Sequence, residues 1–286
     1  MDITIIGAPF NGDGTPVEVE NPAAALRQAG LKSLLGNAGH RVRDSGDLAL
    51  PLADGHRDEE SGILNLTAWR QISDLLAGTI SDQMGSKRFL LILGGDCGIL
   101  VGIAAAYHQA QSPLGLVFLD GHADFQMPQN SPEGELADME LAVLTGHAPQ
   151  SLVATFGKSP LIAPENVAVF GIRAYEEIDR TGINVFGHGR MTEIGIPASI
   201  AEGLQPLLDK NLPLWLHFDV DVIDPEWMPV TFPEPGGLSL DEVEQFIQLT
   251  LATGKTIGMS VTCFHPDLDA TGRSTDRLAA LIADAM

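Results

Sequence analysis

The sequence predicts an α/β fold in which a parallel sheet carries helices on both faces. Segments with the composition of buried strands alternate with segments of helical periodicity along all 286 residues. The strand-like segments are nearly continuous apolar runs, which is typical of strands that are covered on both faces. Because no linker, repeat or low-complexity stretch interrupts this alternation, we expect a single domain spanning residues 1–286.

Each expected strand is a short apolar run that ends in glycine, proline or polar residues. The clearest are RFLLILGGD, with its closing glycine pair, and LGLVFLDGHAD. In chain order the expected strands are 3–9, 40–47, 88–96, 114–124, 166–173, 183–187, 212–224 and 256–264. Since helical segments separate most of them, these strands are expected to run parallel.

Each expected helix has apolar residues at helical spacing or a recognisable start signal. Asn21 and Pro22 provide an N-cap followed by proline at the first helical position, and Ser239 with Glu242 forms a capping box. The expected helices are 22–35, 65–84, 99–109, 137–145, 197–210, 239–253 and 274–285, while 50–62 and 126–135 are expected to be polar loops.

The charge and cysteine content narrow the function classes. With 38 acidic and 16 basic residues, the chain has a formal charge of −22, which argues against nucleic acid and anionic membranes as partners and fits a cationic ligand or metal. No apolar run is long enough to span a membrane, and no signal peptide is expected. Only Cys97 and Cys263 are present, which favours a reducing, cytoplasmic location over a disulfide framework.

Metal-binding residue types follow two of the expected strands. Asp120, His122 and Asp124 are spaced two apart, so an extended chain would point them at one spot. Asp219 and Asp221 end another strand with the same spacing. A lone aspartate pair at a strand end is more often a helix cap or a solvated loop. Two such pairs with a histidine predict a metal site, because converging carboxylates beside an apolar core are costly without a cation.

Cys97 is a further candidate ligand. It follows the glycines of GGDCG (94–98) and is expected to start the next helix, where the helix dipole favours a thiolate. A buried, inert cysteine is the alternative interpretation. Its position beyond the carboxyl end of a parallel strand, where such sheets bind ligands, favours the metal-binding role.

Together these segments resemble the ureohydrolase family of arginases and agmatinases. GGDCG (94–98), DGHAD (120–124) and HFDVDVIDP (217–225) are similar, in this order, to the family motifs GGDHS, D-A-H-x-D and S-x-D-x-D-x-x-D-P. The resemblance covers most of the chain. It implies a three-layer α/β/α sandwich with a parallel sheet of about eight strands, and by analogy a homo-oligomer, either a trimer or a hexamer.

The resemblance also implies a cofactor and a reaction. Two Mn²⁺ per chain would be held by Cys97, Asp120, His122, Asp124, Asp219 and Asp221, with Asp120 and Asp219 bridging the ions. The substrate would be a small guanidino compound. Water activated at the metals would attack the guanidinium carbon, and Asp124 would pass its proton to the leaving amine.

The chain departs from the family motifs at three positions. Cys97 replaces a histidine ligand, and a thiolate there favours a softer ion such as Zn²⁺ on that side. In having this cysteine the chain resembles a branch of the family with Nω-hydroxyarginine amidinohydrolase activity. Cys263 stands where the family has a guanidinium-binding glutamate, unless it only packs. Ala137 stands where the family has a mobile histidine, so His265 is the preferred replacement in proton transfer, with His147 and His217 as alternatives.

Two further segments are expected to contact substrate. GIRAYEE (171–177) is similar to the family region that binds the substrate amino group, so Glu176, followed by Glu177, is expected there, with a solvated acidic turn as the alternative. Asn130 and Ser131 lie in the loop after the metal strand and could contact a carboxylate.

The sequence therefore predicts a metal-dependent amidinohydrolase that converts a guanidino or N-hydroxyguanidino compound to an amine plus urea or hydroxyurea. One alternative is a deacetylase-like amidohydrolase with a single Zn²⁺ on Asp120, His122 and Asp219. Another is a catalytically inactive relative that acts as a binding protein.

Overall fold

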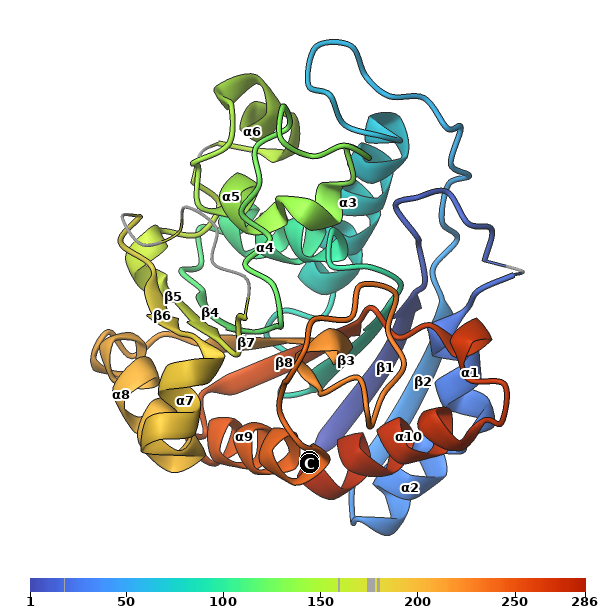
Figure 1. Cartoon of the computed structure of the whole chain (residues 1–286), viewed down its shortest axis with the longest axis vertical. Helices are drawn as coiled ribbons and strands as arrows, with labels where there is room; N and C mark the ends of the chain where they lie inside the picture. The colour runs from blue at the N-terminus through green and yellow to red at the C-terminus, as the bar shows by residue number, and fades with distance from the viewer. Residues whose placement is uncertain (18, 159, 174–177, 179–180) are drawn as a thin grey trace.

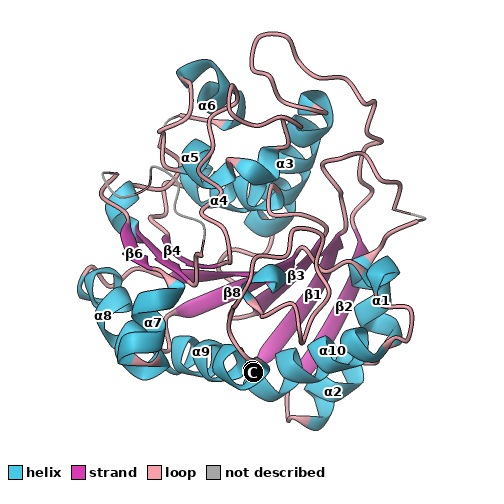
Figure 2. Ribbon diagram, viewed as in Figure 1, coloured by secondary structure: helices cyan, strands magenta, loops and turns pink. Residues whose placement is uncertain are grey.

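The computed structural model describes residues 1–17, 19–158, 160–173, 178 and 181–286. Within these residues an all-parallel sheet of eight strands has the order β2-β1-β3-β8-β7-β4-β5-β6 (Figure 2). The strands are β1 (Asp2–Ala8), β2 (Arg41–Asp47), β3 (Phe89–Gly94), β4 (Gly115–Leu119), β5 (Val167–Phe170), β6 (Asn184–Phe186), β7 (Leu214–Asp219) and β8 (Thr256–Thr262). The predicted parallel α/β fold is confirmed.

Helices cover both faces of this sheet (Figure 1). One face carries α3 (Leu66–Ser81), α4 (Ile99–Gln109), α5 (Glu140–Leu144) and α6 (Gln150–Phe156). The other carries α1 (Pro22–Gln28), α2 (Leu31–Asn37), α7 (His188–Ile194), α8 (Ile196–Asp209), α9 (Leu240–Ala252) and α10 (Arg273–Ala285). Alternate strand residues enter the two apolar cores: in β3, Leu90 and Ile92 pack on one face and Leu91 and Leu93 on the other. The expected three layers are therefore present.

Capping residues in the sequence predicted some helix ends correctly, whereas other helix ends were not predicted. The Asn21 side chain accepts a hydrogen bond from the backbone of Ala24, and Ser239 and Glu242 form the expected capping box. The predicted helix 22–35 is wrong as a single element: α1 and α2 are separate because Gly30 adopts a left-handed φ of 82° between them. The short helices α6 and α7 were not predicted.

The described part of the chain contains no helix that is both long enough and apolar enough to cross a bilayer.

Candidate metal centre

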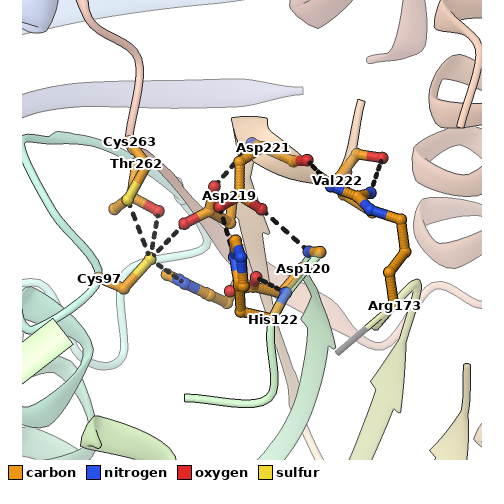
Figure 3. A network of polar contacts seen from close by, with 11 residues as sticks. Cys97, Asp120, His122, Arg173, Asp219, Asp221, Val222, Thr262 and Cys263 are labelled. Carbon is orange, nitrogen blue, oxygen red and sulfur yellow. Dashed lines mark hydrogen bonds and ion pairs between the residues drawn. The ribbon is translucent and has the colours of Figure 1, made fainter. Parts of the chain in front are cut away.

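The predicted metal ligands lie at the carboxyl ends of three strands in the centre of the sheet, and the predicted substrate contact Cys263 follows a fourth. β3, β8, β7 and β4 are neighbours in the centre of the sheet. Cys97 follows β3, Asp219 ends β7, and three ligands follow β4, while Cys263 follows β8 (Figure 3). The parallel topology thus brings together residues that are far apart in the sequence, as the sequence predicted.

The local chain path differs from the extended one that was predicted. β4 ends at Leu119, and Val220–Val222 form a short 3₁₀ helix (η3) after β7. The Asp120 carboxylate accepts a hydrogen bond from the backbone N–H of His122 at 2.6 Å, and Asp219 accepts one from the N–H of Asp221 at 2.7 Å. Each aspartate therefore bends its own backbone, as short acidic side chains do at turns.

Asp124 also lies outside an extended segment, because its φ is 44°. Side chains two residues apart thus converge through turns and not through strand periodicity.

One half of the centre is built on Asp120, His122 and Asp221, whose potential ligand atoms lie within 4.8 Å of one another. Nδ1 of His122 is 2.8 Å from Oδ2 of Asp221, and the backbone N–H of Gly121 donates to the other Asp221 oxygen at 3.0 Å. This set differs from the single-zinc set of the alternative hypothesis, which had Asp219 in place of Asp221.

Arg173 fixes the chain that carries Asp221. Its guanidinium donates to the backbone carbonyls of Asp221 at 2.7 Å and Val222 at 3.0 Å (Figure 3). The backbone N–H of Arg173 donates to the carbonyl of Gly121. The segment after β5 thereby ties the β4 and β7 turns together. Sequence reasoning missed this residue, although its place in GIRAYEE was the available signal.

The other half surrounds the Cys97 thiol. Its Sγ donates to Oδ2 of Asp219 at 2.7 Å and lies 3.1 Å from Oγ1 of Thr262, 3.5 Å from Sγ of Cys263 and 3.1 Å from Nε2 of His217 (Figure 3). His217 is fully buried, and its other ring nitrogen contacts the Ser260 hydroxyl at 2.9 Å. Burial lowers the pKa of His217 to about 3, so this imidazole is neutral.

The predicted helix-dipole effect on Cys97 is wrong. Cys97 precedes Gly98, the N-cap of α4, and the helix itself begins at Ile99. Burial, together with the neighbouring Cys263 and the charges of Asp219 and Asp120, raises the pKa of Cys97 well above its usual value. The metal-free site therefore holds a thiol, and a thiolate here needs a cation.

Glu140 also belongs to this half, and sequence reasoning missed it. It is the first residue of α5, it is fully buried, and one of its oxygens lies within 4.8 Å of potential ligand atoms of Cys97 and Asp124. The sequence signal was a glutamate inside an otherwise apolar helical stretch.

A cavity of about 790 Å³ opens over the centre. Its described wall contains Cys97, His122, Asp124, Asp219 and Asp221, but no lysine or arginine. Further acidic residues of the wall are Asp13, Glu20, Asp96, Glu133, Glu135, Asp138, Glu234 and Asp267. Burial and the neighbouring acids raise the pKa of Glu135 to about 7. The cavity is therefore suited to a cationic molecule.

The predicted substrate contacts have different placements. Cys263 and His265 both line the cavity, and Nδ1 of His265 is 2.7 Å from the Glu20 carboxylate. Asn130 is exposed and does not belong to the described wall. Glu176 and Glu177 lie outside the described residues.

The alternative proton-transfer histidines do not line the described wall either. His147 contacts the Thr145 hydroxyl and the Phe125 ring, and His217 is buried beneath Cys97.

The donor set fits divalent ions. Oδ2 of Asp120 is buried without a hydrogen-bond partner among the described residues, and the buried carboxyl of Glu140 has the Asp124 carboxyl as its side-chain partner. Burial, the largest cause, and mutual repulsion raise the pKa of Asp120 and Asp124 well above the usual range, and that of Asp219 to about 7. Such groups are costly unless they are protonated or bound to a cation, and carboxylates, imidazole and thiolate are ligands of Mn²⁺ and Zn²⁺.

Comparisons with known proteins agree with this geometry. A family model described as the arginase family matches residues 1–286. An arginase from Staphylococcus aureus is 29% identical over 98% of this chain and 95% of its own length. Human Arginase-1 is 29% identical over 96% of this chain and 88% of its own.

Solved structures show the same fold. The arginase of Bacillus caldovelox superposes with a TM-score of 0.89 at 27% identity and covers 99% of this chain and 97% of that one. Formimidoylglutamase from Bacillus subtilis shares the fold, with a TM-score of 0.76, at 18% identity over 100% of this chain and 86% of that one. The resemblance expected from the sequence motifs is thus confirmed, and the chain belongs to the arginase family of ureohydrolases, hydrolases that act on amidine C–N bonds.

Proposed function

We propose that this protein is a metal-dependent amidinohydrolase that converts a guanidino or N-hydroxyguanidino compound to an amine plus urea or hydroxyurea. The observation that carries the proposal is the convergence of carboxylates, an imidazole and a thiol beneath a cavity whose described wall has no basic side chain except histidine. We also propose that residues 1–286 form one catalytic domain, and that the protein is cytoplasmic and homo-oligomeric, a trimer or a hexamer.

Two divalent ions, Mn²⁺ or with Zn²⁺ on the Cys97 side, would polarise the substrate and lower the pKa of water at the site. Asp120 and Asp219, both almost fully buried, would be shared between the two ions, as the resemblance implies. His122 and Asp221 would complete one site, and Asp124 and Cys97 the other. All six roles remain part of this proposal.

Asp124 is the proposed proton carrier, because the resemblance to the family motif D-A-H-x-D implies this role for it, and its carboxylate lines the cavity, as those of Asp219 and Asp221 also do. One of its oxygens would accept the proton of the attacking water and return it to the leaving nitrogen. His265, which contacts Glu20 and lines the cavity, would relay protons between that nitrogen and solvent.

The substrate side favours a guanidino group of reduced basicity. Cys263 lines the cavity where the family motif has glutamate, so a full ion pair with a guanidinium is lost at that position. The acidic wall above it would hold positive charge elsewhere on the substrate. Glu176 stays a proposed substrate contact. Asn130 is proposed with less support, because it is exposed outside the cavity.

The test is a panel of guanidino and N-hydroxyguanidino compounds assayed with Mn²⁺ and with Zn²⁺. Urea or hydroxyurea release from one of them, abolished by Asp124→Asn, is the expected result. Acetate release from acetylated amines, with no urea or hydroxyurea, would instead support the deacetylase-like alternative.

A further inference from the structure

Glu140 has no function within the proposed set of six ligands, although it is among the most enclosed acidic residues of the described chain. Its exposed fraction is 0%, and no N–H or hydroxyl group of another described residue donates to its carboxylate oxygens; its side-chain neighbour is the Asp124 carboxyl, with which it can share a proton. A buried carboxyl without a donor or a cation destabilises the folded state, and more so when it is ionised. A fold that keeps such a group needs a partner for it.

The position of the carboxylate identifies the kind of partner. One of its oxygens lies within 4.8 Å of Sγ of Cys97 and of a carboxylate oxygen of Asp124. Ligand atoms about 2.0–2.6 Å from one ion have this kind of mutual separation. Glu140 does not line the cavity, so it approaches the centre from the protein side, where substrate does not bind.

The neighbouring Asp124 carboxyl can satisfy Glu140 only while the two groups share a proton, because two ionised carboxylates repel each other. No lysine or arginine side chain makes a described contact with the Glu140 carboxylate. A divalent cation is therefore the partner that satisfies Glu140, Asp124 and Cys97 together.

We propose that Glu140 is a further metal ligand on the Cys97 side of the centre. This proposal rests on the proposed metal-dependent function and deepens it. Cys97, Asp124 and Glu140 would form a set of one sulfur and two oxygen donors, with Asp120 and Asp219 available to bridge to the second ion. The loss of the family's imidazole at position 97 would thereby be offset by a carboxylate from α5. A mixed thiolate and carboxylate set suits Zn²⁺ better than Mn²⁺.

The proposal is tested by titrating the metal-free protein with Cd²⁺ and following the ultraviolet charge-transfer absorption of the Cd–thiolate bond. This signal reports occupancy next to a cysteine and needs no catalytic activity. The titration is run at pH 8 with a phosphine reductant, because the two thiol sulfurs are 3.5 Å apart. Glu140→Gln is compared with Glu135→Gln, which removes a carboxylate from the cavity wall but from none of the clustered ligand sets.

We expect Glu140→Gln to weaken Cd²⁺ binding at least about tenfold, as the loss of a group that supports a metal does, and Glu135→Gln to change it by less than about twofold. Equal affinities of wild type and Glu140→Gln would overturn the Glu140 proposal, as would an equal loss in both variants, which would indicate a general charge effect. Absence of Cd²⁺, Zn²⁺ and Mn²⁺ binding by the wild type would overturn the proposed metal-dependent function as well.

A second measurement uses only the wild type, so it tests the proposal even if Glu140→Gln does not fold. In a crystal structure of the wild type with Zn²⁺ or Cd²⁺, we expect an oxygen of Glu140 within about 2.0–2.6 Å of the ion nearest Cys97. A carboxylate that stays beyond this distance while that ion is present would overturn the proposal and leave the other six ligands unaffected.

Discussion

At the scale of single residues, the Cys97 side of the centre contains an exchange of side chains. The family motifs place histidine at position 97 and serine at position 217, whereas this chain has cysteine and histidine there. The two side chains are 3.1 Å apart, so the imidazole that has left position 97 is replaced by one that reaches toward the same space from β7. The smaller side chain at position 97 makes room for the larger one at position 217, so the two changes depend on each other.

This exchange predicts coupling between Cys97→His and His217→Ser. The first substitution alone places two imidazoles in one fully buried space, and the second alone leaves a void and takes away a partner of Ser260. Together they restore the family pattern. We expect the double variant to bind Mn²⁺ at least about tenfold more tightly than Cys97→His alone, with an interaction energy above about 1 kcal/mol in a double-mutant cycle of calorimetric affinities. Additive effects would contradict the idea that the two residues share one space.

Glu135 predicts a pH-dependent stability difference. Burial and the nearby Asp138, Asp13 and Glu133 raise its pKa to about 7, so the folded state holds a proton that the unfolded state releases at lower pH. The corresponding stabilisation is present at pH 4 and is lost as the pH rises through about 7.

The side chain that Glu135→Gln introduces does not ionise, so the variant should become more stable relative to the wild type as the pH rises from 5 to 8. We expect its free energy of unfolding to rise by at most about 1 kcal/mol relative to that of the wild type, because solvent screens this partly exposed group. Thermal melts of chelator-treated protein measure the difference. Glu60→Gln is the control for the loss of charge, because Glu60 is exposed and is not among the acids that raise the pKa of Glu135. A gain that does not depend on pH would contradict the assignment.

At the scale of elements, the sequence predicted all eight strands and their convergence, because apolar runs and the parallel topology depend on simple periodicity and connection rules. It could not predict how the chain turns after β4 and β7, since Asp120 and Asp219 bend the backbone with their own side chains. Arg173 and Glu140 were missed for another reason. Their roles depend on which turns lie beside them in space, and the spacing of residues along one element carries no such information.

The end of β3 provides an element-level prediction. A Cβ on Gly95 would lie 2.2 Å from the carbonyl oxygen of Phe10, in the loop after β1, and the Gly95 carbonyl accepts the N–H of Cys263 after β8. Gly95→Ala should therefore force three strand ends apart and lower the free energy of unfolding by about 2 kcal/mol.

Gly78 is the matched control, because it lies in α3 and a Cβ there meets nothing within 4 Å. Gly78→Ala should raise the free energy of unfolding by about 0.5–1 kcal/mol. Urea denaturation compares both variants with the wild type, and an unchanged midpoint for Gly95→Ala would show that the loop after β1 yields without cost.

At the scale of the whole molecule, negative charge is concentrated where the fold is most constrained. The chain carries −22 in total, and its centre holds buried carboxyl groups directly beneath an acidic cavity. Packing of the two cores on either side of the sheet fixes these groups in place, so the molecule cannot relieve their repulsion by local movement alone. Protonation and cation binding are the two remaining ways to stabilise this cluster of carboxyl groups, and they compete for the same carboxylate oxygens.

That competition predicts opposite pH trends for the two forms of the protein. Without metal, burial raises the pKa of Asp120, Asp124 and Glu140 strongly and that of Asp219 to about 7. For raised carboxyl pKa values the stabilisation is complete below about pH 4 and is lost as the pH rises through the folded-state values, so the melting temperature of chelated protein should fall between pH 5 and pH 8. Mn²⁺ or Zn²⁺ at 100 times the dissociation constant should add about 2.7 kcal/mol.

At a fixed metal concentration the gain in melting temperature should be larger at pH 8 than at pH 5, because fewer protons have to be displaced. Melts with and without chelator measure both trends, with KCl at matched ionic strength as the control for screening. If no divalent ion changes the melting temperature at either pH, the result would favour the inactive binding protein over the enzyme. Protonation alone would then stabilise the buried carboxyl groups, and the site would bind no cation.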